Sequence, residues 1–177
     1  MAGFHTKTFL NHDDYMTPKH AWEDIKQFIP PNKLIWECFY GDGQSGKDLQ
    51  EVLGNNNEVC HEPRDFFLTS SQQIIDLNMT LISNPPFSLK KEVFTRLKEL
   101  GLPFIMICPS AMLQTQYIRQ LFSDSDDPLQ IIIPRRRIQF LKQVDGEVPK
   151  DYISRCNFDC FYYCWKINLP RDIIWLN

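Results

Sequence analysis

The sequence predicts an α/β domain built on a largely parallel β-sheet. Segments with apolar residues at helical spacing alternate with short strand-like runs, which is the order expected when helices connect parallel strands. The run 103–108 is almost entirely apolar, as in a strand that is covered on both faces. The length of 177 residues, with 43% hydrophobic and 23% charged, predicts one soluble globular domain over residues 1–177.

Residues that begin or end helices mark the helical segments. Thr17 as N-cap and Pro18 as the first helical residue would begin the first helix, and a pair of prolines ends it. Gly54 and Gly101 are the expected C-caps of two later helices. The predicted helices are 18–29, about 47–53, 90–100 and 110–122.

Six segments are candidate strands. The last two follow one another without a helix between them, so they should pair antiparallel. Pro134 is expected to break or bulge the first of that pair, and residues 65–78 predict only a short strand or a turn. The predicted strands are 33–38, 58–62, 80–83, 103–108, 129–141 and 158–167.

Composition and spacing exclude several classes of protein. No apolar stretch approaches the ~18 residues of a spanning helix, and the N-terminus lacks the apolar segment of a secretory signal. We therefore expect no membrane partner and an intracellular location, in the cytoplasm or the nucleus. Cys156, Cys160 and Cys164 are four residues apart, wider than paired zinc knuckles, and the histidines lack ligand spacing, so we expect no metal site.

A glycine-rich turn between a strand and a helix indicates a cofactor site. Residues 41–46, GDGQSG, match G-x-G-x-x-G, in which glycines let a ligand approach the backbone closely. Residues 41–47 also resemble a phosphate loop, but Asp48 stands where Ser or Thr must coordinate magnesium, which excludes a nucleoside triphosphate. Glu37 and Asp42 would repel a pyrophosphate and attract the ammonium and sulfonium groups of S-adenosylmethionine.

The tetrapeptide Asn84-Pro85-Pro86-Phe87 follows a predicted central strand and suits methyl transfer to an exocyclic amine. The Asn84 side-chain oxygen and the Pro85 carbonyl can accept both amine hydrogens, which would aim the nitrogen lone pair at the methyl group. The prolines fix the direction of that carbonyl, and Phe87 offers a face to an extruded base. The alternative is that the prolines only terminate the strand, with Phe87 in the core.

These motifs resemble those of amino-group DNA methyltransferases, in particular the Asn-Pro-Pro-Phe type that methylates adenine N6. Residues 37–43, ECFYGDG, resemble the acid-x-Phe-x-Gly-x-Gly motif of that family. The small size resembles the stand-alone enzymes of phages and large DNA viruses, whose location would be the host-cell cytoplasm. The resemblance implies a class I, Rossmann-like methyltransferase fold with an antiparallel last strand, and S-adenosylmethionine as cofactor.

The resemblance also implies a set of cofactor contacts. Glu37 would hold the methionine amino end, Phe39 would pack on the cofactor, Glu62 would bind the ribose hydroxyls and Asp65 the adenine amino group. Only two residues separate Glu62 from Asp65, so at least a helix of the family pattern is shortened or lost. The full set is Tyr15, Thr17, Pro18, Glu37, Phe39, Gly41, Asp42, Gly43, Glu62, Asp65 and Phe66.

Basic residues are the candidate contacts to the substrate nucleic acid. They are Lys90 and the run Arg135, Arg136 and Arg137, and the alternative is that they are ordinary solvated ends of a helix and a strand. The net charge of −3 argues against electrostatic coating of nucleic acid and leaves room for a local basic rim. We expect no separate target-recognition domain, so specificity would come from the 142–156 loop, from a second copy or a partner subunit, or be low.

Two alternatives to a DNA methyltransferase stay open at this point. The first keeps the chemistry and changes the substrate to adenosine in RNA, including cap-adjacent adenosine, or to a protein glutamine amide. The second is a non-catalytic subunit that keeps the fold and binds nucleic acid for an active partner. That second alternative predicts a damaged glycine turn or tetrapeptide, and both motifs are intact here.

Overall fold

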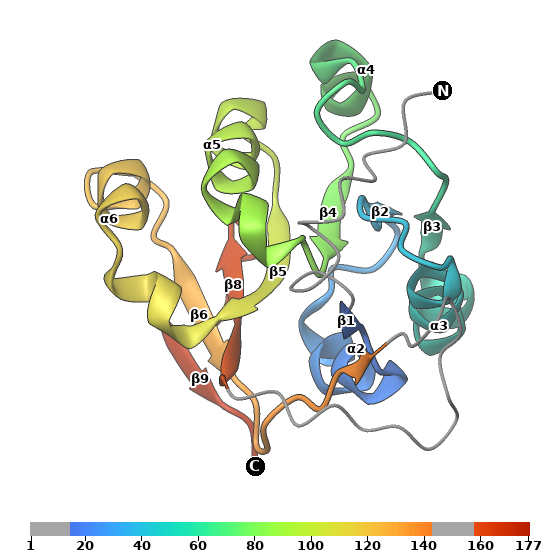
Figure 1. Cartoon of the computed structure of the whole chain (residues 1–177). Coiled ribbons are helices and arrows are strands. Elements are labelled where there is room, and N and C mark those ends of the chain that lie inside the picture. The colour runs from blue at the N-terminus through green and yellow to red at the C-terminus, as the bar shows by residue number, and fades with distance from the viewer. Residues whose placement is uncertain (1–14, 143–157) are drawn as a thin grey trace.

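The structure is a computed structural model that describes residues 15–142 and 158–177 (Figure 1). In this part of the chain, seven strands form one sheet with the order β3-β2-β4-β5-β8-β6-β9. Their bounds are β2 (Leu34–Trp36), β3 (Glu58–Cys60), β4 (Thr80–Ser83), β5 (Phe104–Pro109), β6 (Gln130–Ile133), β8 (Cys160–Trp165) and β9 (Ile173–Trp175).

The sheet is parallel except at one strand. β2 pairs parallel with β3 and β4, and β4 with β5, whereas β8 pairs antiparallel with both β5 and β6. The mainly parallel sheet with an antiparallel strand near its end is therefore confirmed. β9, which was not predicted, follows β8 and pairs parallel with β6, so the antiparallel strand is not the last one.

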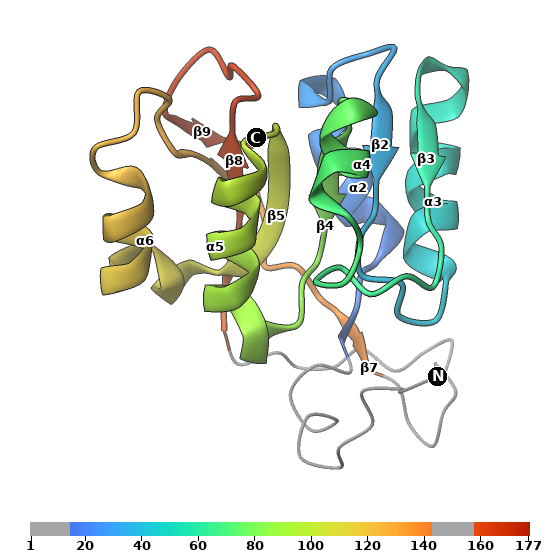
Figure 2. The same cartoon turned by 90° about the horizontal axis from the view of Figure 1, so that it is seen from above.

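Helices cover both faces of the sheet (Figure 1). α4, α5 and α6 lie on one face, and α2 and α3 lie on the other; Figure 2 shows the same layers from above. Their bounds are α2 (Lys19–Ile25), α3 (Gln44–Leu53), α4 (Ser71–Asp76), α5 (Lys90–Leu100) and α6 (Gln116–Phe122).

Each face of the sheet has its own apolar core. One core joins α2 and α3 to the sheet through fully buried residues such as Trp22 and Leu49. The other joins α5 to the strands through Phe94 and Phe104, whose ring centroids are 5.6 Å apart. Burial of each such side chain stabilises the fold by about 2–3 kcal/mol, which fixes the strand ends that carry the site.

Several local predictions need correction. The first helix has Pro18 as its N-cap, with an extended ψ of 145°, so Thr17 is not the cap. The segment 65–78 contains a helix, α4, whose first turn is capped by the Ser70 side chain. The break expected at Pro134 within 129–141 is confirmed: β6 ends at Ile133, before the proline that cannot donate to the ladder.

A second, two-stranded sheet joins the first described residues to a segment that precedes β8. β1 (Tyr15–Met16) pairs antiparallel with β7 (Leu141–Lys142). Figure 2 shows this ribbon beside the main sheet, below the ends of β2 and β4. Neither strand was predicted, because two residues are too few to show a period. None of the described helices is long and apolar enough to span a membrane.

Candidate functional site

The structure brings the glycine turn and the tetrapeptide together. The turn follows β2 and the tetrapeptide follows β4, and these strands pair directly through Ile35↔Thr80 and Trp36↔Leu81. Both motifs therefore emerge at the carboxyl edge of the sheet, where ligands bind in open α/β folds. The ribbon strand β1 lies between them, since a Cβ on Gly41 would meet Met16 Sδ at 3.4 Å and the Tyr15 carbonyl accepts from Asn84.

The glycine turn needs its first two glycines for their backbone conformation. Gly41 has φ 57° and Gly43 has φ 83°, which side chains rarely adopt. Gly43 is the N-cap of α3, and its N–H donates to the Tyr40 carbonyl over 2.9 Å. Asp42 is exposed and its Oδ1 accepts from the Gln44 N–H at 3.0 Å. The turn thus presents a carboxylate at the positive end of a helix.

The third glycine of the motif serves a different purpose. A Cβ on Gly46 would lie 2.0 Å from the ring of His61, so only glycine fits while His61 keeps its place. On its other side the His61 ring stacks on Tyr40, with centroids 4.7 Å apart and planes inclined at 21°. His61 therefore fills the space beneath the first turn of α3. No sequence motif includes His61, and its one local signal is that a polar residue directly follows a strand.

Beneath the turn lies a buried cluster of polar side chains. Glu37 is 1% exposed, its Oε1 accepts from the Ser83 hydroxyl, and its Oε2 lies 2.6 Å from His61 Nδ1. Burial raises the pKa of Glu37 against the lowering effect of His61 and Ser83. Burial lowers the pKa of His61, but its hydrogen bond and attraction to Glu37 outweigh this and raise it. His61 and Glu37 therefore titrate as a coupled pair.

The two raised pKa values predict that stability falls as the pH rises. Glu37 and His61 hold protons in the folded state that the unfolded chain releases from its ordinary values of 4.5 and 6.5. The free energy of unfolding should therefore decrease from about pH 5 upward, until both groups are deprotonated. Urea denaturation across this range measures it. In His61→Gln the free energy of unfolding should depend less on pH above about pH 6.5. An unchanged slope in that variant would contradict the raised pKa of His61.

One hydrogen bond orients the Asn84 side chain and leaves its acceptor oxygen unused by the described residues. Its Nδ2 donates to the Tyr15 carbonyl at 3.3 Å, which orients the amide. Its Oδ1 is buried and accepts no hydrogen bond from any described residue. A buried acceptor without a donor costs about 1–3 kcal/mol, so an N–H placed there by a ligand would be bound strongly.

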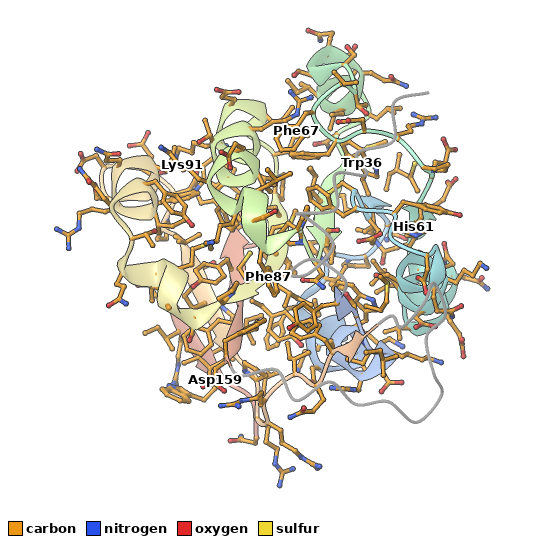
Figure 3. The ribbon with its side chains drawn as sticks, in the orientation of Figure 1. Trp36, His61, Phe67, Phe87, Lys91 and Asp159 are labelled. Atoms are coloured by element: carbon orange, nitrogen blue, oxygen red, sulfur yellow. The ribbon has the colours of Figure 1, made fainter. Side chains whose placement is uncertain are left out.

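Phe87 packs in an aromatic cluster at the centre of this edge (Figure 3). Its ring centroid lies 6.4 Å from Tyr15, 6.0 Å from Phe140 and 5.3 Å from Phe158. Phe87 is 9% exposed, so its faces are largely covered by these rings. Stacking of a base on Phe87 stays a prediction, and in this arrangement it requires a neighbouring ring to move. Tyr15 and Phe158 are the half-buried members of the cluster.

On the other side of the turn, Phe39 and Phe66 form a second aromatic contact, with centroids 5.0 Å apart. Asp65 Oδ1 accepts from the two backbone N–H groups of Phe67 and the following residue, at 2.7 and 3.2 Å, so it shapes this turn. Glu62 is exposed and pairs with Arg64 at 2.6 Å. The predicted adenosine contacts thus lie on one short segment after β3.

The predicted basic residues differ in their surroundings. Arg135, Arg136 and Arg137 are exposed and follow β6, which runs parallel to β5, so they lie at the carboxyl edge. Arg137 pairs with Asp159 at 2.7 Å (Figure 3 labels Asp159). Lys90 donates to the Phe87 carbonyl at 2.9 Å, and this bond closes the turn before α5. Arg135 and Arg136 are therefore the better placed of the four to meet a polymer.

The edge offers donors and acceptors to a polar, zwitterionic ligand. Buried side-chain atoms without a hydrogen bond to the described residues include Ser45 Oγ on α3, His61 Nε2 and Asn84 Oδ1. Thr17 and Pro18 are buried directly before α2, after β1. Together with the exposed carboxylate of Asp42, these groups fit S-adenosylmethionine. No three His, Cys, Asp or Glu side chains group as a metal site within residues 15–142 and 158–177.

No protein-family model matches this chain, and no curated protein matches it. Solved structures that are similar to it at low identity include three methyltransferases. The first is a putative rRNA methylase from Clostridium thermocellum, 12% identical, with a TM-score of 0.41 over 85% of this chain and 94% of that one. The second is a SAM-dependent O-methyltransferase from Thermotoga maritima, 12% identical, with a TM-score of 0.45 over 82% and 64%. The third is the 23S rRNA methyltransferase ErmE, 13% identical, with a TM-score of 0.43 over 86% and 70%.

The strand order of the sheet decides the fold class. Parallel strands β3, β2, β4 and β5 are followed by the antiparallel β8, which is inserted between β5 and β6. The fold is that of a class I methyltransferase. In this fold β3 is an edge strand of the sheet. The short segment from Glu62 to Asp65 leads only to a turn and to α4. The shortening inferred from the sequence therefore lies at this edge.

Proposed function

We propose that this protein transfers a methyl group from S-adenosylmethionine to the N6 amino group of adenine in DNA. The observation that carries the proposal is Asn84, whose buried Oδ1 has no donor among the described residues. It stands at the end of β4, next to a glycine turn at the end of β2. The pair of motifs matches the family resemblance in the sequence, and the fold is the one that this chemistry uses.

The chain's own residues would activate the amine by accepting its hydrogens. The lone pair of an exocyclic amine is delocalised into its ring, so it is a poor nucleophile. Asn84 Oδ1 and the Pro85 carbonyl would accept the two N–H groups and direct the lone pair toward the methyl carbon. Bound S-adenosylmethionine supplies an electrophilic methyl group on its sulfonium. The nitrogen loses a proton to solvent after transfer, so no side chain is required as a base.

The cofactor would lie across the carboxyl ends of β2 and β3. Asp42 would attract its ammonium group, and the peptide groups of Gly41 and Gly43 let it approach the backbone. Phe39 and Phe66 would pack on its adenine side. Glu62 would bind the ribose hydroxyls once its ion pair with Arg64 is broken. Each of these roles follows from the family resemblance and from the position of the residue at this edge.

The exposed arginines would bind the phosphate backbone of the substrate. The plot of log K for DNA binding against log salt concentration has a negative slope. Exchanging Arg135 and Arg136 together for glutamine should make that slope less steep by about 2, since each phosphate contact contributes about 1. Fluorescence anisotropy with a labelled duplex at several salt concentrations measures the slope. Exchange of the exposed Arg119 and Arg171 is the matched control, because these residues lie on α6 and before β9, outside the basic run. An unchanged slope in the double variant would place the DNA elsewhere.

Methyl transfer itself tests the function. The protein is incubated with labelled S-adenosylmethionine and with duplex DNA, single-stranded DNA, RNA or a mixture of proteins, and the products are digested and analysed by mass. We expect N6-methyldeoxyadenosine in a DNA sample. N6-methyladenosine only in RNA, or methylglutamine in protein, would replace the substrate and keep the chemistry. Failure of the chain to bind S-adenosylmethionine in calorimetry would support a non-catalytic subunit instead.

A further inference from the structure

We propose that His61, Glu37 and Ser83 form a positioning network that couples the cofactor turn to the catalytic end of β4. The proposal rests on the proposed function and adds to it a residue, His61, on which cofactor binding depends. None of the three needs to touch the reacting atoms. Each is a positioning residue that acts through a neighbour, since the turn and the tetrapeptide make the contacts.

The network joins the ends of three adjacent strands. Ser83 is the last residue of β4, Glu37 directly follows β2 and His61 directly follows β3. Glu37 is the hub, because one carboxylate oxygen accepts from Ser83 and the other forms an ion-pair contact with His61 Nδ1 at 2.6 Å. His61 Nδ1 also lies 3.2 Å from the Glu37 backbone carbonyl. All three side chains are almost completely buried, so water does not compete for these bonds.

On the cofactor side, His61 determines where the glycine turn lies. Its ring is held between Tyr40 and the backbone of Gly46, at a distance that leaves no space for a Cβ. The groups that face it are Glu37 from the end of β2, Asp42 and Tyr40 from the turn, and the positive end of α3. The two carboxylates favour the protonated ring and the helix end opposes it. Loss of the ring or its charge should therefore shift the turn.

On the catalytic side, Ser83 holds the backbone that carries Asn84. Ser83 is fully buried, and its hydroxyl is fixed by Glu37. Asn84 follows it in the chain, and its amide is fixed by the Tyr15 carbonyl. The acceptor oxygen of Asn84 is thus held from two directions. A shift of Glu37 is transmitted to it through a single peptide unit.

This arrangement also changes the expected role of Glu37. Glu37 Oε1 accepts from Ser83 and Oε2 lies 2.6 Å from His61 Nδ1, so Glu37 supports the turn from beneath, while Oε2 accepts no hydrogen bond from the described residues. Because Glu37 is buried, the exposed carboxylate of Asp42 is the more accessible of the two to the cofactor ammonium. Exchange of Glu37 and exchange of Asp42 should for this reason have different effects.

The test separates binding from the chemical step. His61→Gln keeps an N–H donor for Glu37 and removes the charge. In calorimetry we expect this variant to bind S-adenosylmethionine about tenfold more weakly near pH 6. The unmodified protein should lose affinity as the pH rises to about 8, and the variant should not. Ser83→Ala should lower the single-turnover rate at saturating cofactor about tenfold and change the cofactor Kd by less than about threefold. His20→Gln, on the exposed face of α2, is the matched control and should behave as the unmodified protein.

A second measurement reads the network without cofactor. The imidazole resonances of His61 are titrated by NMR in the folded protein and in its Ser83→Ala variant, and coupling through Glu37 predicts that the midpoint of His61 shifts in the variant. An unshifted midpoint, or a His61→Gln protein with unchanged affinity and pH dependence, overturns the proposal. If the unmodified protein binds no S-adenosylmethionine, the proposed function and its link to the network both fail, while the NMR result still shows whether the three groups are coupled.

Discussion

Asn84→Ala should lower the rate of methyl transfer at least about 100-fold, the usual effect of removing one preorganised hydrogen-bonding group that acts on the transition state. The variant loses the buried Oδ1 that would accept an amine hydrogen, and it also loses the bond from Nδ2 to the Tyr15 carbonyl. The cofactor lies on the neighbouring turn, so its Kd should change by less than about threefold. Single-turnover transfer and calorimetry measure the two quantities.

Asn55→Ala is the control for this variant, because Asn55 is exposed and lies at the opposite end of the sheet, before β3. It should retain full activity. If Asn84→Ala kept the rate, the tetrapeptide would only terminate β4, which is the alternative given for it from the sequence. If the variant lost rate and cofactor affinity in equal measure, Asn84 would support the fold of the edge and not the reaction.

Gly46→Ala should destabilise the fold strongly, by about 3 kcal/mol, the upper end of the usual cost of overpacking. The added methyl group would lie 2.0 Å from the ring of His61, so α3 or the ring must move. His61 cannot move freely, because it is held by Glu37 and Tyr40. Urea denaturation measures the cost, and the displaced turn should also weaken cofactor binding.

A double-mutant cycle makes this prediction specific. His61→Ala alone leaves Glu37 buried without its partner and should cost about 3–5 kcal/mol. Adding Gly46→Ala to it should cost nothing further, because the methyl group then occupies space left by the ring, and alanine favours a helix by up to about 1 kcal/mol. Gly54→Ala is the control: its φ of 61° makes alanine unfavourable, but the space is open, so His61→Ala should not rescue it. Additive costs for Gly46 and His61 would contradict the contact.

Local signals in the sequence were sufficient for the elements that position the site. Helix 90–100 and strand 80–83 have the predicted bounds, because Gly101 adopts the left-handed conformation of a C-cap and the prolines after Asn84 end the strand. The helix α4, which was not predicted, was missed for a physical reason. In α4 only Ile74 is buried, while Ile75 and Leu77, the residue after the helix, are 40% and 48% exposed, so the segment shows no apolar face.

The candidate site was predictable where a motif is contiguous and not where it is assembled in space. The glycine turn and the tetrapeptide were found from their residues, and their adjacency followed from the strand order. His61 could not be found in this way, because its partners Glu37 and Ser83 come from two other strands, and nothing local distinguishes it from a solvated histidine. The sequence motif also suggested that Gly46 makes room for a ligand, whereas the structure shows that it makes room for His61.

The ribbon of β1 and β7 has a consequence for how the site is completed. Its two strands, at 15–16 and 141–142, are separated by most of the chain, so their pairing closes a very long loop and is expected to form after the local contacts of the sheet. Tyr15 belongs to this ribbon and holds Asn84. The edge that would do the chemistry is therefore expected to be among the last parts to fold and among the first to open in native-state fluctuations, while the sheet beneath it stays intact.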